Sequence, residues 1–553
     1  MKSLCINNGV TQCLRSVLLT ISLLAFLCSP VSADDLPSSF ESSVSALAKA
    51  SFKEKEKLIP HIVTFNDPRT QQVLELMLGG DLFYQKKSLE IVTREKAEGG
   101  YLITNVLTGD EIGVVGKRKV KKVKVNNKLR SLIKGELAKM SLFHNDRQVR
   151  LNAVNEIVKS LNKESVALLV EAQLKEQDQE IQSAISVALA LINLESDDKA
   201  KRLDALTVLS ESVDAQVKAS VEVLLLTTEE GEYLEADAEI RNEASKTLKQ
   251  IEGNIKYYSF LETLFFGLSL GSVLLLAAIG LAITFGVMGV INMAHGELIM
   301  IGAYTTYVVQ LLMPNHIDYS LFVAIPAAFI IAGLVGVLIE RGVIQFLYGR
   351  PLETLLATFG ISLILQQLVR TIFSPLNRSV ETPSWMSGAW EINSAFAMTY
   401  NRLYIIIFSI LVFLVLLLIL KKTVFGLQMR AVTQNREMAR AMGVRSGWVD
   451  AMTFGLGAGI AGIAGVALSQ LTNVGPNMGQ AYIIDSFMVV VFGGVGNLWG
   501  TLVAAFSLGV VNKFLEPWVG AVLAKILVLI FIILFIQKRP RGLFPQKGRH
   551  AEN

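Results

Sequence analysis

The chain has 553 residues, of which 52% are apolar and 18% are charged, and its mean hydropathy is +0.46. This apolar content exceeds what one soluble domain needs and predicts a membrane protein. The formal net charge of +4 is small for the length, so it gives no reason to expect a nucleic-acid partner.

The first 33 residues have the pattern of a secretory signal peptide. Lys2 and Arg15 precede an apolar run from 17 to 27, and the small residues Val31 and Ala33 precede two aspartates. The run is too short to span about 30 Å of hydrocarbon as an uncleaved anchor. Cleavage after Ala33 would remove all three cysteines, so the mature chain would need neither disulfides nor thiol chemistry.

Residues 34–255 are predicted to form an exported, mainly helical domain. Lysine and glutamate are frequent here, and no apolar run is long enough to cross a membrane. The pattern is helical up to about Gly80. Two alternating stretches, 100–104 and 120–125, flank the turn-like Thr108-Gly-Asp and predict a small β-hairpin.

A repeated pattern occupies about residues 140–250 of this domain. Each copy has an Asp, an aliphatic residue three positions on and then a polar residue, and the copies begin at Asp146, Asp178, Asp214 and Asp237. The Asp suits a helix N-cap, and the aliphatic residues would line one buried face. We expect a HEAT-like helical stack, which would bind partners rather than catalyse. Because the spacing of the copies is irregular, an ordinary helical bundle is the alternative.

Residues 256–545 predict a polytopic helical membrane domain with eight or nine spans. The apolar stretches are about 260–284, 287–312, 320–340, 352–373, 403–420, 449–470, 483–497, 500–515 and 518–537. The seventh is too short for a full crossing unless it is broken. The basic loop 421–445 and the basic C-terminal tail are predicted to be cytoplasmic, which places the 34–255 domain outside.

Three polar residues, Asn292, His295 and Glu297, lie in a stretch that is otherwise apolar enough for a bilayer. Polar groups at that depth are costly and indicate function. The nearby glycines allow a broken helix that presents polar atoms to a solute near the membrane midplane. A short water-exposed turn between two ordinary spans is an equally good interpretation of the pattern.

The loop 425–444 predicts a short amphipathic helix that could seat in a groove of a partner. The residues available for its apolar face are Val432, Met438, Ala439 and Met442. A basic loop that only holds two spans in place is the alternative. A glycine cluster then interrupts the penultimate spans, and both a gating role and simple close packing fit its members, Gly493, Gly494 and Gly496.

Three motifs together resemble the permease subunits of the branched-chain amino-acid ABC importers. They are Ile291-Asn-Met-Ala-His-Gly-Glu297, the loop from Gly426 to Gly443 with the span after it, and Val491-Phe-Gly-Gly-Val-Gly-Asn497. Within that family, the stretch 350–367 and the long signal-bearing N-terminal extension look most like the urea-importer permease. The resemblance covers about residues 258–545 and does not extend to residues 34–250.

The resemblance implies a multi-pass subunit of the bacterial inner membrane with an N-terminal periplasmic domain. The implied partners are a second permease, cytoplasmic ATP-binding subunits, a periplasmic substrate-binding protein and membrane lipid. The chain has no Walker A motif, so we expect it to be no enzyme, with ATP hydrolysis on a partner and no cofactor or metal. The loop residues expected to couple to the ATPase are Gly426, Arg430, Ala431, Arg440 and Gly443.

The preferred substrate from this resemblance is urea or a short-chain amide. Urea is neutral and planar, so its path should offer amide, hydroxyl and carbonyl groups rather than a full charge. The candidate pathway residues are Asn292, His295, Glu297, Thr358, Gln366, Gln367 and Asn473. Two alternatives stay open: a branched-chain amino-acid permease, and a membrane-anchored scaffold or receptor whose spans only hold the repeat domain.

Overall fold

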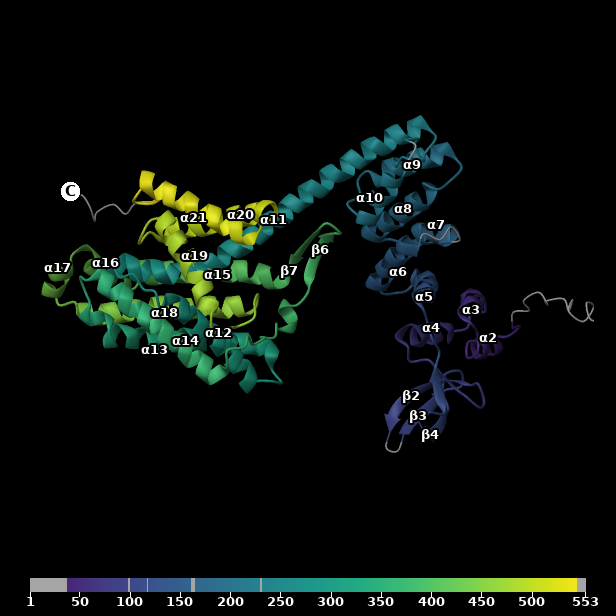
Figure 1. Cartoon of the computed structure of the whole chain (residues 1–553), viewed down its shortest axis with the longest axis horizontal. Helices are drawn as coiled ribbons and strands as arrows, with labels where there is room; N and C mark the ends of the chain where they lie inside the picture. The colour runs from purple at the N-terminus through teal and green to yellow at the C-terminus, as the bar shows by residue number, and fades with distance from the viewer. Residues whose placement is uncertain (1–36, 98–99, 117, 161–164, 229–230, 545–553) are drawn as a thin grey trace, which may run out of the picture. The chain divides into compact units, whose positions relative to one another are not determined.

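The computed structural model describes residues 37–97, 100–116, 118–160, 165–228 and 231–544 (Figure 1). The predicted signal peptide and its cleavage position lie outside the described residues. The chain forms two compact units: the first runs to residue 249 apart from 213–215, and the second contains those three residues and everything from 250 on. One long helix, α11 (Ala238–Met288), belongs to both units.

The first unit begins with three helices, α2 (Phe40–Ala46), α3 (Phe52–Thr64) and α4 (Thr70–Gly79). Helix α3 starts at a capping box, in which the Ser51 hydroxyl accepts the Glu54 N–H and the Glu54 carboxylate accepts the Ser51 N–H. Helix α4 ends at Gly80, whose φ of +82° is the left-handed conformation that glycine adopts without strain. The helical prediction up to about Gly80 is therefore confirmed.

A five-stranded antiparallel sheet follows, in the order β4-β3-β2-β1-β5. Its strands are β1 (Phe83–Gln85), β2 (Ile91–Ala97), β3 (Gly100–Asn105), β4 (Glu111–Val115) and β5 (Val120–Lys122). The predicted hairpin is confirmed at its turn, since β3 and β4 pair on either side of Thr108-Gly-Asp, but its second strand is 111–115 and not 120–125. The stretch 100–104 pairs with β2 and β4, and the stretch 120–125 pairs with β1 across more than thirty residues of sequence. The first unit is therefore not all-α, because it contains a five-stranded sheet where only a small hairpin was predicted.

Helices make up the rest of the first unit, and in Figure 1 they follow one another from the sheet to the start of α11. They are α5 (Asn127–Ser141), α6 (Arg147–Ser160), α7 (Val166–Lys175), α8 (Gln179–Asn193), α9 (Lys199–Leu209) and α10 (Ala215–Val223). Aliphatic residues of α5, α6, α7 and α8 share one buried core, which includes Val154, Leu169 and Ile185. Helices α5 to α8 therefore have a continuous interior of their own.

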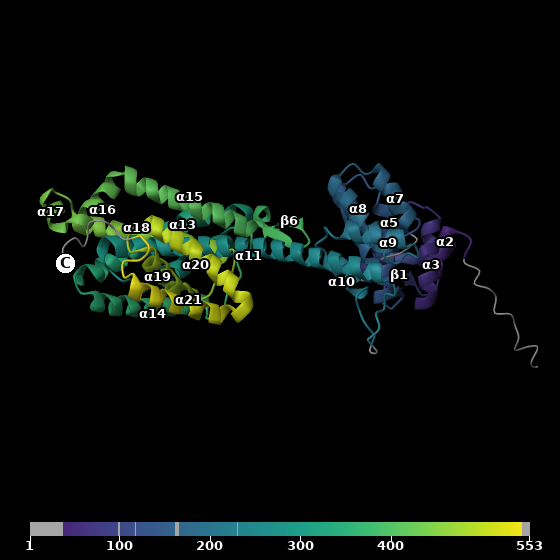
Figure 2. The same cartoon turned by 90° about the horizontal axis from the view of Figure 1, so that it is seen from above.

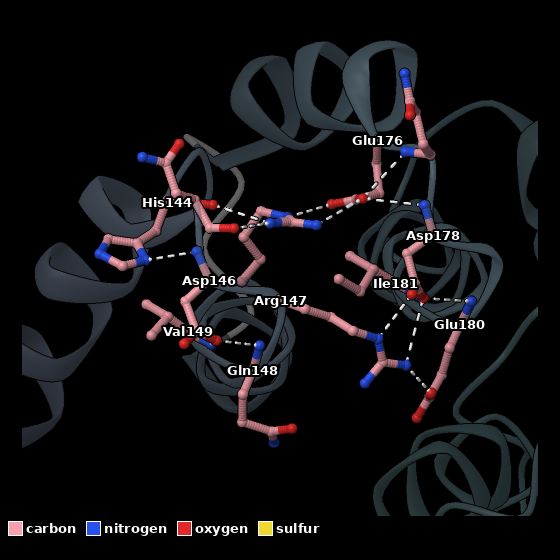
Figure 3. A network of polar contacts seen from close by, with 12 residues as sticks. His144, Asp146, Arg147, Gln148, Val149, Glu176, Asp178, Glu180 and Ile181 are labelled. Carbon is pink, nitrogen blue, oxygen red and sulfur yellow. Dashed lines mark hydrogen bonds and ion pairs between the residues drawn. The ribbon is translucent and has the colours of Figure 1, made fainter.

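At three of the four copies of the repeat, the Asp caps a helix in the way that the pattern predicts. Asp146 accepts the N–H groups of Gln148 and Val149, and Asp178 accepts those of Glu180 and Ile181 (Figure 3). Asp237 makes the same two bonds at the start of α11. Each cap satisfies backbone donors that would otherwise have no partner in the first turn.

The polar residue four positions after the Asp has a recurring partner as well. Arg150 and Arg241 each donate to the carbonyls one and two positions before their Asp, and Gln182 donates to the carbonyl two positions before Asp178. Neighbouring copies are joined by ion pairs, Arg147 with Asp178 at 2.7 Å and Arg150 with Glu176 at 2.7 Å (Figure 3). The repeat thus has a shared local structure, while its HEAT-like assignment stays a prediction.

The second unit consists of the end of α11 and ten further helices in the described part of the chain. They are α12 (His295–Leu312), α13 (Ile317–Gly342), α14 (Pro351–Phe373), α15 (Tyr400–Lys422), α16 (Val424–Gln434), α17 (Arg436–Ala441), α18 (Ser446–Ser469), α19 (Met478–Gly493), α20 (Leu498–Val519) and α21 (Ala521–Lys538). Two short 3-10 turns, η2 (Ile344–Phe346) and η3 (Ser384–Met386), and a two-stranded sheet of β6 (Ala389–Asn393) and β7 (Phe396–Thr399) complete it.

Seven described helices are long and apolar enough to cross a membrane: α11, α13 with its following turn, α14, α15, α18, α20 and α21. They coincide with seven of the nine predicted stretches. The other two stretches, 287–312 and 483–497, correspond to α12 and α19, which do not meet the same criteria, and α19 has only 16 residues. Seven spans are therefore supported among the described residues, and the prediction of eight or nine is not confirmed.

Close contacts between glycines pack the centre of the second unit, where α11 lies among the other helices in Figure 2. A Cβ placed on Gly302 of α12 would lie 2.0 Å from the carbonyl oxygen of Gly462 of α18. A Cβ on Gly280 of α11 would lie 2.3 Å from the carbonyl oxygen of Gly457. Helices α11, α12 and α18 can therefore approach one another backbone to backbone, as small residues allow in membranes.

Candidate functional site

The predicted break in the membrane segment is present between α11 and α12. Helix α11 ends at Met288, Gly289 has a φ of +69°, and α12 begins only at His295. Asn292, His295 and Glu297 are 0–1% exposed in this chain. The water-exposed turn is therefore wrong for these side chains, and the broken-helix interpretation holds.

Asn292 and His295 each make one hydrogen bond and keep one polar atom without a partner. The Asn292 side-chain oxygen accepts the Ala294 N–H at 3.0 Å, while its Nδ2 has no acceptor among the described residues. The His295 Nε2 lies 2.8 Å from the Ala277 carbonyl oxygen. A carbonyl only accepts, so Nε2 carries the hydrogen in this arrangement, and Nδ1 is left without a partner in the described chain.

Glu297 faces a polar stripe on α14. Its Oε1 accepts hydrogen bonds from the Ser362 hydroxyl at 3.1 Å and the Gln366 amide at 2.9 Å. One turn earlier, the Thr358 hydroxyl accepts the Met293 N–H at 3.1 Å. The second oxygen of Glu297, Oε2, is buried and has no hydrogen-bond donor in the described part of the protein.

The structure thus brings together five of the seven predicted pathway residues: Asn292, His295, Glu297, Thr358 and Gln366. It does not bring Gln367 or Asn473 into this cluster. Both are exposed, and Gln367 lies about 100° around the helix from Gln366. The remaining cluster member, Ser362, was missed. Thr358, Ser362 and Gln366 recur every four residues in an apolar helix, which is a signal that the sequence offers.

One positive charge lies near the cluster. Arg370, one turn after Gln366 on α14, interacts electrostatically with the Glu297 carboxylate. Its guanidinium also donates to the Asn477 side-chain oxygen at 2.6 Å, just before α19. The site therefore contains a carboxylate and a guanidinium as well as neutral hydrogen-bonding groups.

The predicted coupling loop folds as two short helices, α16 and α17, which meet at Asn435. Its predicted single apolar face is wrong. Val432 and Ala439 are buried, whereas Met438 and Met442 are exposed, so the loop has one inner and one outer apolar surface.

The five predicted coupling residues all lie on this loop, where several pack inward. Arg430 donates to the Leu420 carbonyl at 2.7 Å, and Arg440 donates to the Ser446 hydroxyl at 2.7 Å. Gly426 is buried against Leu420, and Ala431 is half-buried. Gly443 has a φ of +87° at the turn into α18. The arrangement fixes the loop firmly to the ends of α15 and α18.

The glycine cluster after α19 packs closely against its neighbours. A Cβ on Gly493 would lie 2.5 Å from the backbone of Gly500, and Gly496 approaches Gly286 of α11 equally closely. Gly494 and Gly496 have φ values of +104° and +77°. Close packing and a turn that needs glycine thus account for these three positions, and a gating role stays a prediction.

Sequence reasoning also missed three interactions of buried carboxylates in the second unit. Asp450 pairs with Arg436, Asp485 pairs with Lys525 at 3.0 Å, and Glu340 accepts the Tyr348 hydroxyl at 2.9 Å. The partners lie 14, 40 and 8 residues apart, so none has the three- or four-residue spacing by which a helical pair is recognised in a sequence. Within the described residues, no group of three or more His, Cys, Asp or Glu side chains could hold a metal ion.

Known proteins resemble the second unit. Residues 263–536 match the family described as branched-chain amino acid transport system / permease component. The high-affinity branched-chain amino acid transport system permease protein LivH of Salmonella typhimurium is 31% identical over 298 residues, which cover 52% of this chain and 96% of that protein. LivH of Escherichia coli K12 is 30% identical over the same coverage. BraD of Pseudomonas aeruginosa is 28% identical over 295 residues, with 96% of it covered.

No solved structure matches this chain significantly. The match to the permeases nonetheless extends over nearly their whole length, and the matched residues include the helix break, the polar stripe of α14 and the loop α16–α17. The chain therefore belongs to the family of permease components of branched-chain amino acid transport systems.

Proposed function

We propose that this chain forms part of the translocation pathway of an ABC importer for a small polar solute, with ATP hydrolysis on separate subunits. The observation that carries the proposal is the Glu297 carboxylate, buried at a helix break and held by Ser362 and Gln366. Its free Oε2 and the free atoms of Asn292 and His295 offer hydrogen bonds to a solute. A membrane segment that served only as an anchor would have no use for these costly groups.

A branched-chain amino acid is the substrate that these groups favour. Glu297 of α12 is an acceptor for an ammonium group. Arg370, which continues the polar stripe of α14, is a donor for a carboxylate. The relatives reported above are named as branched-chain amino acid permeases. Urea is the second candidate, because Thr358, Ser362 and Gln366 are neutral groups that match its amide chemistry and because the stretch 350–367 resembles the urea-importer permease.

Uptake of labelled leucine and labelled urea by cells that contain the whole transporter separates these candidates. We expect leucine to be carried in preference to urea and Glu297→Gln to reduce leucine uptake at least tenfold, since it removes the charge while keeping the size of the side chain. The control is Glu353→Gln, which makes the same chemical change at an exposed carboxyl on α14 that pairs with Arg350. If urea is carried in preference to leucine, the substrate assignment is reversed. If Glu297→Gln takes up both solutes at the wild-type rate, Glu297 is not part of the pathway.

Two further variants, Asn292→Leu and His295→Leu, test the cluster without changing its charge. Each removes a hydrogen-bonding group, and we expect reduced uptake with the complex still assembled. Loss of a buried hydrogen bond alone costs roughly 1–3 kcal/mol of stability. Assembly is therefore measured beside uptake: loss of both would show a structural role, and loss of uptake alone would support a pathway role.

The implied partners of the importer are part of the same proposal: a second permease subunit, cytoplasmic ATP-binding subunits and a periplasmic substrate-binding protein. The two-helix loop α16–α17 presents Met438 and Met442 outward, at 61% and 79% exposure, and is the surface that we assign to the ATPase. Copurification of an ATPase subunit with this chain supports the importer. Its absence from an otherwise intact complex would favour the membrane-anchored scaffold instead.

The first unit is proposed to lie in the periplasm as a partner-binding domain, after removal of the signal peptide at Ala33. The support is the charge distribution of the loops, with basic residues in 421–445 on the opposite side. Protease added to spheroplasts should remove residues 34 to about 255 and spare the C-terminal tail. If the domain is protected in right-side-out cells, this topology is wrong.

A further inference from the structure

A basic pocket lies where α17 turns into α18. It has a volume of about 740 Å³, and its lining residues are Arg341, Arg440, Gly443, Val444, Arg445, Ser446, Gly447 and Trp448. Three of these carry guanidinium groups, and none is acidic. The arginines come from three places in the fold: the end of α13, helix α17 and the residue before α18.

The arginines keep most of their hydrogen-bonding capacity. Arg440 uses its Nε on the Ser446 hydroxyl, which leaves its two terminal nitrogens. Arg341 has only a long contact of 3.7 Å from its Nε to Glu340, and Arg445 has no ion pair within the described residues. Planar guanidinium groups with free N–H donors bind phosphate oxygens in pairs, which ammonium groups cannot do.

Backbone donors at the pocket add to the same preference. Arg445, the residue before α18, gives no side-chain cap. The N–H groups of Ser446 and Gly447 therefore have no acceptor in the described part of the chain. Two free backbone amides and three guanidinium groups surround one cavity and together form an anion site. The amides alone, or the arginines alone, would not be enough to identify such a site.

The pocket lies at the ends of two helices, α13 and α18, that are long and apolar enough to cross a membrane. Arg341 is in the last turn of the spanning helix α13, and Ser446 begins the spanning helix α18. Trp448 is 58% exposed, and its ring lies 5.7 Å from the Arg341 guanidinium. Tryptophan and arginine at the end of a span are typical of the headgroup region.

Exposed apolar side chains continue from the pocket along both helices. Leu338 lies one turn before Arg341 and Met452 one turn after Trp448, so each shares a face of its helix with a pocket residue. These side chains offer a surface for acyl chains next to the cationic site. A single inorganic phosphate would fill little of a cavity of this size.

We propose that this pocket binds the phosphate of an anionic phospholipid headgroup, with its acyl chains along Leu338 and Met452. Basic pockets between membrane helices are a known way of recognising such headgroups. The bound lipid would hold the corner between α17 and α18 in place, directly behind the loop assigned to the ATPase.

The test uses the full-length protein purified with its partner subunits, examined by native mass spectrometry during titration with phosphatidylglycerol or phosphatidylcholine. We expect one phosphatidylglycerol to bind specifically and its apparent affinity to fall at least tenfold in Arg341→Gln/Arg445→Gln. Arg445→Lys should lie between the two, since it keeps the charge and loses the planar fork. The matched control Arg350→Gln changes an exposed arginine outside the pocket and should bind as the wild type does.

Other outcomes overturn the proposal. Equal binding of phosphatidylglycerol by the wild type and the double variant would exclude this site, provided that both run as the same assembled complex. Displacement of the lipid by millimolar inorganic phosphate would show a site for a soluble anion. Loss of the ATPase subunit from the double variant with unchanged lipid binding would show that the pocket contacts a protein instead.

Discussion

Arg436 and Asp450 form a two-bond ion pair, with Nη1 2.7 Å from Oδ2 and Nη2 3.0 Å from Oδ1. Asp450 is completely buried in the first turns of α18, while Arg436 begins α17 in the loop. Helix α18 packs in turn against α12, which carries His295 and Glu297. The ion pair therefore joins the loop to the helix that packs against α12 and its polar residues.

Removing Arg436 should disturb both stability and coupling. Arg436→Gln leaves the Asp450 carboxylate buried without its partner, and breaking such a pair costs roughly 3–5 kcal/mol. We expect a lower midpoint of thermal unfolding and loss of uptake. In Arg436→Gln/Asp450→Asn, where neither residue is charged, the loss of stability should be smaller than the sum of the single variants. Additive effects would show that the two residues act independently.

Two substitutions of Gly443, by Asn and by Asp, test the proposed ATPase contact with similar backbone strain in both variants. At its φ of +87°, Asn and Asp are the least unfavourable side chains, and they differ here only in charge. We expect Gly443→Asn to transport nearly as the wild type does and Gly443→Asp to hydrolyse ATP without uptake, because nothing in this chain lies within 4 Å of the added carbon and the new charge would face the proposed ATPase contact. Both rates are measured on the reconstituted complex. Normal uptake by Gly443→Asp at normal expression would contradict the coupling role.

The membrane part of the fold could be predicted from sequence because its signals are local. Seven long apolar stretches form helices that are long and apolar enough to cross a membrane, and Asn292, His295 and Glu297 were singled out because polar residues in such a stretch are conspicuous. The side-chain partners of Glu297, Ser362 and Gln366, lie 65 and 69 positions away on α14. Ser362 could have been found from its four-residue spacing with Thr358, but nothing in the sequence shows which helix that stripe faces.

The sheet of the first unit could not be predicted for a different reason. Strands β1 and β5 have three residues each, so neither shows enough alternation to be recognised. Their pairing joins Phe83 to Lys122, and such a register depends on the tertiary fold rather than on local pattern. The helix caps at Asp146 and Asp178 succeeded because a cap is made within three residues.

Because the backbones of α12 and α18 are in contact, we expect the addition of one methyl group at Gly302 to lower the stability of the protein. In Gly302→Ala the new Cβ would lie 2.0 Å from the Gly462 carbonyl, so the helices must separate, at a cost of roughly 1–3 kcal/mol or more. We expect a lower unfolding midpoint and reduced uptake. Gly360→Ala is the matched control in α14, where nothing lies within 4 Å of the added carbon. Equal midpoints for the two variants would show that the contact is not close-packed in the assembled protein.

The first unit should lose stability in acid through an ion pair between Asp67 and Arg69. Hydrogen bonds from the Arg69 side chain, 2.9 Å to Oδ1 and 2.6 Å to Oδ2, lower the pKa of Asp67 from 3.8 to about 2. A carboxyl whose pKa is lower in the folded state stabilises the fold above pH 3.8, and this contribution disappears as the pH falls from 3.8 to about 2. Asp67→Asn should therefore unfold at a lower temperature than the wild type at pH 4, and the difference should become small as the pH falls to about 2 and vanish below it.

The unfolding temperature of the first unit is measured by its resistance to pepsin during heating, because pepsin is active at acid pH. The fragments from residues 37–249 can be followed in the full-length protein. Asp81→Asn is the control, since this exposed carboxyl forms no ion pair within the described residues. Its unfolding temperature should follow that of the wild type at every pH. A difference between the wild type and Asp67→Asn that stayed constant down to pH 2 would mean that the side chain acts through packing or its backbone bond to Arg69, and not through its charge.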